Sequence, residues 1–422
     1  MSKVVNSMVE NVSLDLIIKS LKSELQSVAR SKRFIDWRES GSFSASLGHI
    51  LFEIEKQLLQ QHPPQAIKLL DSFLALGERV MNRCDDSNGD ISGMFREAVD
   101  MWGRAWALLP DFNAQLLVES IWKYFKENDY GLLDDLIPAA ADALKKKGLD
   151  ELEALVKDQY CGGDDFKTFH ALRDIAVVRQ SPEAFLEAFK FTGRKENLSD
   201  QIIRARLLIQ SNRKPEAIIL LESIDDTEHY GRDSLDLLID LYSDGNDIEK
   251  TQQLRWRGFM TRSELKYYHA YSEHAQTSAD KEKALNAALE FAKNHLNPLI
   301  AMGLLHDLGY PDEAARQLRE TYDQLNGRFY PTLLSLSKLF LAAGYPLEAI
   351  LIYRRLAEDI LSRAQSKYYH HAINYLKKEK KLTSKVSDWK LYPETGVYFS
   401  DLARSHAKKP AFMKLFSSVM SP

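Results

Sequence analysis

The stretch MNRCDDSNGDISGMF, residues 81–95, carries oxygen-bearing side chains of the types that bind calcium. A calcium loop of the EF-hand type needs oxygen ligands at positions 1, 3 and 5, a glycine at position 6 and a bidentate glutamate at position 12. With Gly89 at position 6, Asp86 falls at position 3, but positions 1 and 12 hold Cys84 and Phe95. Because the first ligand and the bidentate carboxylate are missing, we expect no calcium site here.

The same loop also fits a turn between two helices. Asp and Asn side chains accept turn geometry, and Gly89 supplies a positive φ angle. Asp90 or Ser92 would then cap a helix that begins near Met94. We therefore predict a capped junction.

Other residue types that could do chemistry do not form a recognisable constellation. His370 and His371 are adjacent on an expected helix and would point about 100° apart, and His269 with Glu273 offers only two ligands. No His-Glu-x-x-His, phosphate-binding glycine loop or Gly-x-Ser-x-Gly elbow is present. Cys161 has no identifiable histidine to activate it as a nucleophile. We expect no catalytic residue, no bound metal and no cofactor, and hence no enzyme.

Composition favours a helical globular protein. The 422 residues are 45% hydrophobic and 27% charged, which suits a large core rather than disorder. Alternating runs rich in Val, Ile and Thr are nearly absent, so strands have little to form from. The two cysteines, Cys84 and Cys161, suit a reducing compartment. No apolar run approaches the roughly 18 residues of a membrane span, so we expect a cytoplasmic protein without a membrane partner.

An internal period organises the chain. The segments SNRKPEAIILLESI, LGYPDEAARQLRET and AGYPLEAILIYRRL each read as a turn followed by a helix start. Weaker copies extend the pattern to six equivalent positions: Ala184, Ala217, Lys250, Ala284, Ala314 and Ala349. In four copies the residue five positions earlier is of a type that tolerates the left-handed conformation ending a helix, namely Asn212, Gly245, Gly309 and Gly344.

A period near 34 residues is typical of tetratricopeptide repeats, in which a small residue lets paired helices approach closely. The next turn of the same face adds a packing stripe: Ala188, Leu221, Leu254, Ala288, Leu318 and Tyr353. The alternative is a non-repetitive helical array in which Pro-Glu-Ala is simply favourable helix-start chemistry. We predict an all-α, tetratricopeptide-like α-solenoid of antiparallel helix pairs. Its parts are an N-terminal helical region (1–165), the repeats (166–381) and a basic C-terminal capping segment (382–422).

Four segments carry a family resemblance: FIDWRESGSFSASLGHIL (34–51), CDDSNGDISGMF (84–95), SKYYHHAINYLKK (366–378) and YFSDLARSHAKKPAF (398–412). Together they resemble an uncharacterised bacterial helical-repeat family that is also seen C-terminal to SWIM-type zinc fingers. The Cys-x-Cys and Cys-x-His ligands of that finger are absent from this sequence. The resemblance implies a helical-repeat fold and a structural role for the aspartate loop, and it transfers no activity.

Charge is unevenly distributed. From residue 361 onward there are twelve basic and four acidic residues, a net charge of +8. Because the whole chain has a net charge of −4, the first 360 residues have a net charge of −12. Tyrosines, a tryptophan and phenylalanines interleave the basic residues. Cations with aromatic rings are typical of a surface for single-stranded nucleic acid. They also fit a solvated cap whose rings are turned inward against the end of a helix stack.

We therefore predict a non-enzymatic scaffold that holds a peptide or helix of a partner protein. The alternative is a nucleic-acid-associated accessory protein that uses the basic, aromatic C-terminal segment. Arg404 and Lys408 are four residues apart and share a helix face, so one anionic partner could engage both. The full set of partner-binding candidates is Lys367, Tyr368, His371, Tyr375, Arg404, His406, Lys408 and Lys409.

Overall fold

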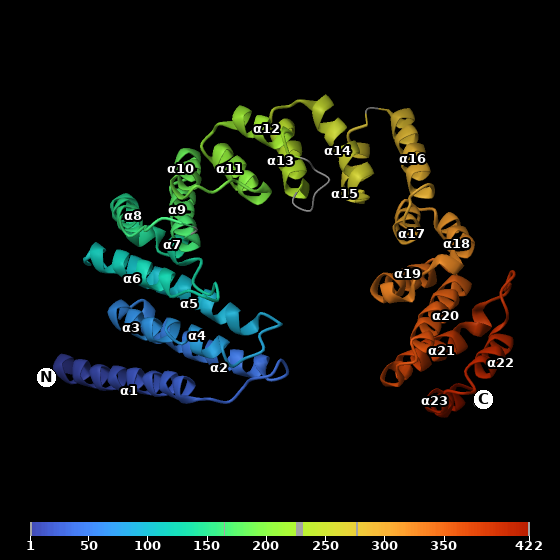
Figure 1. The fold of residues 1–422 in the computed structure, drawn as a ribbon, viewed down its shortest axis with the longest axis horizontal. Coiled ribbons are helices and arrows are strands. Elements are labelled where there is room, and N and C mark those ends of the chain that lie inside the picture. Colours follow the sequence, from blue (N-terminus) through green and yellow to red (C-terminus); the bar gives the residue numbers. More distant parts are fainter. Residues whose placement is uncertain (1, 164, 225–230, 276, 421–422) are drawn as a thin grey trace. The chain divides into compact units, whose positions relative to one another are not determined.

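A computed structural model describes residues 2–163, 165–224, 231–275 and 277–420 of the chain (Figure 1). Regular structure in these ranges is helical, and β pairing is limited to one isolated bridge between Ile35 and Cys84. The predicted all-α class is confirmed. The chain divides into two compact units, Met1–Ser234 and Leu235–Pro422.

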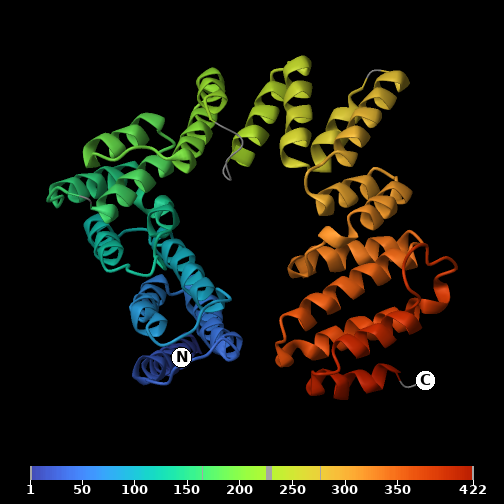
Figure 2. The ribbon, with the colours of Figure 1, turned by 45° about the vertical axis from the view of Figure 1, so that its right-hand side comes forward.

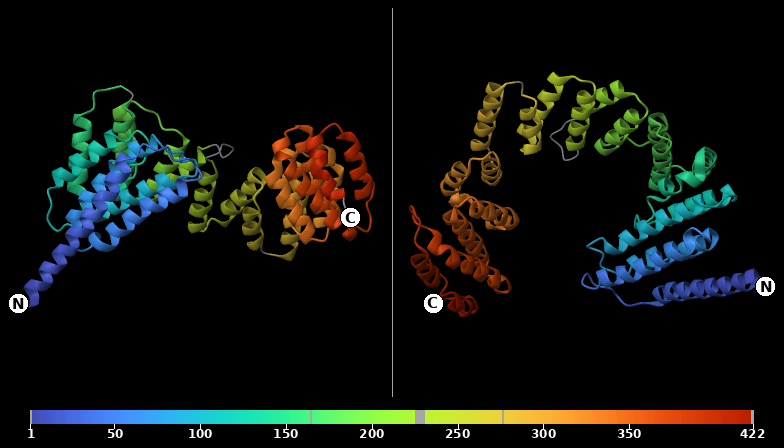
Figure 3. Two further views of the ribbon diagram at one scale, coloured as in Figure 1. Left: turned by 90° about the horizontal axis from the view of Figure 1, so that it is seen from below. Right: turned by 180° about the vertical axis from the view of Figure 1, so that it is seen from behind.

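The first unit is a stack of helices with a main core that runs from Leu21 to Ala188 and a smaller core that includes Phe169, Phe185 and Leu207. Figure 3 shows α1, α3 and α5 of this unit as successive layers. Its helices are α1 (Ser2–Arg30), α2 (Ser40–Ile54), the π-helix η1 (Glu55–Leu59), α3 (Pro63–Leu74), α4 (Gly77–Met81), α5 (Asp90–Ala107), α6 (Ala114–Lys126), α7 (Leu136–Ala139), α8 (Ala141–Asp158), α9 (Phe166–Val178), α10 (Pro182–Thr192), α11 (Leu198–Gln210) and α12 (Lys214–Glu222).

The second unit continues the helix pairs and ends in the basic tail, which Figure 2 shows packed beside α21. The first helix of this unit, α13 (Gly231–Asp244), begins a few residues before the unit boundary at Leu235. The others are α14 (Ile248–Arg262), α15 (Leu265–Glu273), α16 (Ser278–Lys293), α17 (Pro298–Asp307), α18 (Pro311–Glu320), η2 (Tyr322–Gln324), η3 (Gly327–Phe329), α19 (Tyr330–Ala342), α20 (Pro346–Ser362), η4 (Ser366–Tyr368), α21 (Tyr369–Leu382), η5 (Thr383–Lys385), α22 (Thr395–Ser405) and α23 (Pro410–Met420).

The same turn joins the two helices of five pairs. One residue takes a positive φ angle, and the N–H of the next residue donates to the carbonyl five positions earlier at 2.8–3.0 Å, as in a Schellman motif. In the turn between α13 and α14, the residue with the positive φ angle is Asn246 and not the predicted Gly245. The five residues are Gln180, Asn212, Asn246, Gly309 and Gly344.

All six repeat positions fall early in the second helix of a pair, in α10, α12, α14, α16, α18 and α20. Ala217, Ala314 and Ala349 are fully buried, as a close helix contact requires. Ala184 and Lys250 are only half-buried, and these two predicted positions are wrong by one residue. Phe185 and Thr251, five residues after the turn residues Gln180 and Asn246, are the buried residues there. The helix pairs predicted from the period are confirmed within each unit.

The predicted region limits follow the sequence period, whereas the compact units divide between Ser234 and Leu235. α9 begins at Phe166, where the repeats were expected to start, with the Asp165 side chain accepting from the N–H groups of Lys167 and Thr168. None of the described helices is long and apolar enough to cross a membrane.

Candidate interaction surface around α21

A buried ion pair fixes α21 against α20. The Arg354 guanidinium donates to Glu379 Oε1 from Nε (3.0 Å) and Nη2 (2.7 Å), and from Nη1 to the Pro393 carbonyl (2.9 Å). The guanidinium carbon lies 4.1 Å from the ring centroid of Tyr398 and 5.3 Å from that of Trp389. Burial raises the pKa of Glu379, and the bonds from Arg354 oppose that shift. The one acidic residue of α21 is therefore inside the protein.

The outer face of α21 is consequently cationic. At 100° per residue, five of its exposed basic side chains span about 120° of the helix circumference, and a sixth, Lys380, lies about 60° further round, where its Nζ donates to the Val419 carbonyl (3.0 Å). The five are His370, His371, Lys377, Lys378 and Lys381, with Lys367 and Lys385 exposed in the short helices on either side.

Tyrosine rings border this face. Tyr375 is half-buried and stacks on Tyr353 with ring centroids 6.2 Å apart, and Lys378 Nζ lies 5.3 and 5.8 Å from the two centroids. Burial raises the pKa of Tyr375, and the neighbouring phenol of Tyr330 adds to the shift. Tyr330 begins α19 and is 57% exposed, so an accessible ring lies near Tyr375.

The start of α21 gathers three of the predicted residues. Lys367 Nζ lies 4.8 Å from the ring centroid of Tyr368, and the Tyr368 and His371 rings are 6.4 Å apart. The His370 and His371 rings are 3.9 Å apart, so the expectation that they diverge is wrong. Their side chains turn toward each other because both are exposed and free to choose rotamers.

Of the other four predicted residues, Arg404 lies in the last turn of α22, and His406, Lys408 and Lys409 follow that helix. The prediction that Arg404 and Lys408 share a helix face is wrong, because α22 ends at Ser405. The His406 ring packs 5.8 Å from Phe412, and burial, then the Lys409 charge, lowers the pKa of His406. Lys409 Nζ donates to the Leu361 carbonyl in the last turn of α20, a position where a cation also favours the helix dipole. Lys408 is exposed. Lys409 is thus partly a structural cap.

Phe412 brings the two groups to one end of the unit, because its ring contacts Tyr369 (6.0 Å) as well as His406. Arg404 is different: its side chain is 80% exposed and pairs with Asp401 at 3.4 Å. No contact recorded among the described residues links it to α21.

Most rings of the tail are turned inward. Tyr398 donates to Glu358 Oε1 (2.9 Å), and Tyr392 donates to the Arg319 carbonyl (3.0 Å). Phe399 and Phe412 are buried in the core formed by α20 to α23. The tail therefore covers the end of the helix stack with most of its aromatic side chains.

The aspartate loop is a helix cap. Gly89 has φ 73°, and α5 begins at Asp90, four residues before the predicted start at Met94. The N–H groups of Ile91 and Ser92 donate to Asp86 Oδ1 and Oδ2 at 2.8 and 2.9 Å. The predicted caps, Asp90 and Ser92, are wrong, because the positive φ of Gly89 turns the chain so that Asp86 reaches these amides. No group of three or more potential metal ligands occurs in the described part of the chain.

Sequence reasoning missed Arg354, Glu379 and Tyr330. Glu379 entered the sequence analysis only as one of the four acidic residues in the charge balance, although it shares the helical phase of Ile373 and Leu376. That phase was a usable signal for its burial. Arg354 and Tyr330 depend on contacts between segments distant in the sequence.

Comparison with known proteins places the chain in a family. A family model matches residues 4–161 and 165–415. The chain belongs to DUF6880, a family of unknown function. Membership of DUF6880 agrees with the expected uncharacterised family and assigns no activity.

No curated protein matches the chain. Among solved structures, a circular tandem repeat protein with novel repeat topology and enhanced subunit contact surfaces is 12% identical, over 98% of this chain and 96% of that one. The TM-score of 0.18 is too low for the likeness to carry any argument.

Proposed function

We propose that the chain is a non-enzymatic helical-repeat scaffold whose α21 face binds an acidic segment of a partner protein. The observation that carries the proposal is the row of exposed lysines and histidines on α21 together with the burial of Glu379. A face without carboxylates attracts anions and has few internal ion pairs to break on binding. The exposed ring of Tyr330 adds apolar contact area beside the charges.

Nucleic acid is the second candidate partner. The lysines of α21 suit phosphates, and the exposed rings of Tyr330 and Tyr368 could stack on bases. The predicted likeness to the region after SWIM-type fingers would suit such a role, although the finger is missing. A protein partner is favoured because Trp389, Tyr398 and Phe412, the rings expected to stack, are occupied inside the cap.

The test is a pull-down from the native cell, with nuclease-treated and untreated lysates compared. The triple change Lys377→Glu, Lys378→Glu and Lys381→Glu reverses the charge of the α21 face. A matched control reverses the three consecutive exposed lysines of α8, 145–147. We expect a protein partner that survives nuclease, is lost with the α21 variant and is kept with the α8 variant.

Salt dependence separates the two candidates further. Phosphate contacts release counterions, so nucleic-acid binding through three lysines would fall with log salt at a slope of about −2 to −3. Loss of the captured partner after nuclease treatment, with such a slope for a labelled single strand, would favour the nucleic-acid role. Equal retention by both lysine variants would rule out α21 as the binding face.

A further inference from the structure

A surface pocket of about 630 Å³ lies in the first unit, and none of the residues of the α21 face lines it. Four separate segments line it: Phe34 before α2, the end of α4 with residues 84–87, Ser92 and Arg96 of α5, and residues 130–132 between α6 and α7. Its volume is within the range of pockets that hold a small group or a side chain.

The wall that contains the aspartate loop is fixed by backbone pairing. The Ile35 N–H donates to the Arg83 carbonyl (2.9 Å), and the Asp85 N–H donates to the Ile35 carbonyl (2.8 Å). Asp86 is held by its two bonds to the first turn of α5. These contacts hold the segments of Phe34 and Asp85 side by side at the Ile35–Cys84 bridge.

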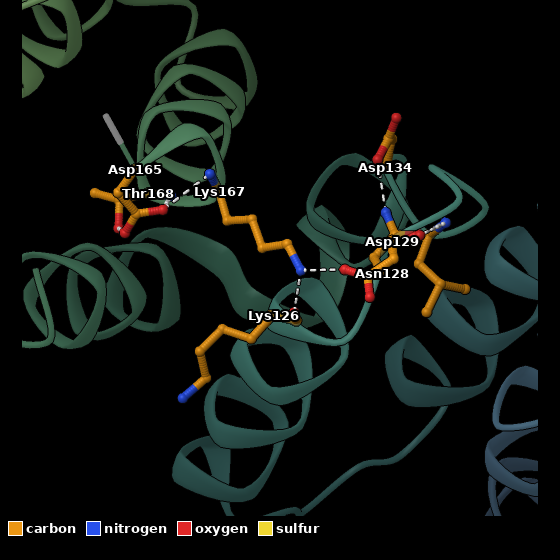
Figure 4. A network of polar contacts seen from close by, with 8 residues as sticks. Lys126, Asn128, Asp129, Asp134, Asp165, Lys167 and Thr168 are labelled. Carbon is orange, nitrogen blue, oxygen red and sulfur yellow. Dashed lines mark hydrogen bonds and ion pairs between the residues drawn. The ribbon is translucent and has the colours of Figure 1, made fainter. Parts of the chain in front are cut away.

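The wall that contains Tyr130 is fixed by polar contacts of the residues on either side of it in the sequence (Figure 4). Lys167 Nζ donates to the Lys126 carbonyl and to Asp129 Oδ1 (2.7 Å), and Asn128 Nδ2 donates to Asp134 Oδ1 (2.6 Å). The Tyr130 hydroxyl donates to Asn82 Oδ1 (2.6 Å). The ring is therefore positioned before any ligand arrives, which reduces the entropic cost of binding.

The lining suits a cation on an apolar stem. Phe34 is 60% exposed and Tyr130 is 47% exposed, so two aromatic rings are accessible at the pocket. Hydrogen bonds from the Ser87 N–H and hydroxyl to Asp85 Oδ1 lower the pKa of that carboxyl, which stays ionised. Aromatic faces with a carboxylate attract guanidinium in particular, because it is planar and stacks.

The Cys84 thiol lies in the lining of the pocket, and its surroundings raise its pKa. Burial raises its pKa, Asp86 and Asp85 raise it further, and Arg83 opposes them. Two carboxylates, Asp85 and Asp86, line the pocket against one cation, Arg96, so a cationic group is favoured over an anionic one.

We propose that this pocket binds the arginine side chain of a partner polypeptide, with the guanidinium against Asp85 and the rings of Phe34 and Tyr130. Met81 and Leu132 contact the aliphatic stem. This inference does not depend on the α21 face, which has the opposite charge, so either can fail without the other.

Cys84 provides the assay. With Cys161→Ser, Cys84 is the single thiol, and its alkylation by neutral iodoacetamide is followed by mass spectrometry. Three probes are titrated: the blocked peptide acetyl-Gly-Arg-Gly-amide, its citrulline counterpart, which has the same shape without the charge, and free arginine. We expect the arginine peptide to slow alkylation at concentrations of about 1–10 mM, the range for one small group. Citrulline should not protect, and free arginine should protect less than the peptide.

Variants of the lining residues test the binding itself, apart from any change in the reactivity of the Cys84 thiol. Half-protection concentrations are compared, so a change in the basal alkylation rate does not matter. Asp85→Asn, which can still accept from Ser87, should raise the half-protection concentration about fivefold, and Tyr130→Leu should raise it similarly. Arg96→Gln removes a like charge and should lower it about twofold.

Equal protection by citrulline, or protection unchanged in Asp85→Asn, would overturn the proposal. Absence of protection up to about 50 mM peptide would also overturn it, since that is weaker than one cation–carboxylate contact allows. Tighter binding of free arginine than of the peptide would refute a polypeptide source.

Discussion

Replacing Glu379 with Leu should weaken the packing of α21 against α20, because it leaves the buried Arg354 guanidinium without its carboxylate partner. Arg354 is 1% exposed, and its guanidinium would keep only the Pro393 carbonyl and two aromatic rings as partners. It would lose two charge-assisted bonds of 3.0 and 2.7 Å. Removing one partner of such a pair typically costs about 3–5 kcal/mol.

Hydrogen exchange followed by mass spectrometry suits this test, because a chain with two compact units need not unfold in one step. A cost of about 4 kcal/mol corresponds to exchange about a thousandfold faster for amides of α21 that open with this contact. The double change Arg354→Met with Glu379→Leu removes both charges and should restore exchange to within about tenfold of the wild type.

Glu313→Leu is the matched control, because it breaks an ion pair with Arg316, which is 56% exposed. Breaking an exposed pair should cost less than about 1 kcal/mol. An exchange rate in Glu379→Leu within a few fold of this control would refute the reasoning. So would a double variant as unstable as the single one, since the cost would then not come from the stranded charge.

Four further outcomes are expected. Ala349→Leu should overpack a fully buried contact and lower the free energy of unfolding by about 1–3 kcal/mol, whereas an unchanged denaturation midpoint would place the alanine outside a close contact. Asp86→Ala should cost about 1–2 kcal/mol through loss of the α5 cap, and calcium titration calorimetry should detect no stoichiometric site tighter than about 10 µM in either protein. Burial raises the pKa of Asp174 to about 6, so the folded state holds the proton more tightly and stability should fall as pH rises from about 4 to 6; Asp174→Asn should flatten that part of a pH series of melting temperatures. Arg404→Glu with Lys408→Glu should weaken partner binding with little change in melting temperature, because both side chains are exposed, and a large fall with binding retained would make them structural only.

The helix pairs could be predicted because their turn is local. A glycine or asparagine in the left-handed conformation, followed by a helix start, requires only a few neighbouring residues. Asn212, Gly309 and Gly344 were identified this way. The copy at Asn246 was placed one residue early because Gly245 beside it is the more usual residue for this conformation.

The aspartate loop could be predicted only in part. Ligand counting predicted no EF-hand arrangement and a capped junction, and in the structure Asp86 uses both carboxylate oxygens to cap α5. The identity of the cap was wrong because several aspartates and a serine could each accept these bonds. The choice among them depends on the path of the chain, which the Ile35–Cys84 bridge helps to fix.

The surface around α21 shows where pattern reading reaches its limit. The positions of its lysines and histidines on one side of the helix follow from 3.6-residue periodicity alone. The cationic character of that side depends also on Glu379, which is buried only because Arg354, 25 residues earlier, compensates its charge. The same pair therefore fastens α21 and removes the helix's carboxylate from solvent. A change that exposed Glu379 would weaken the packing and reduce the positive field together, so binding by this face and the stability of α21 should be coupled.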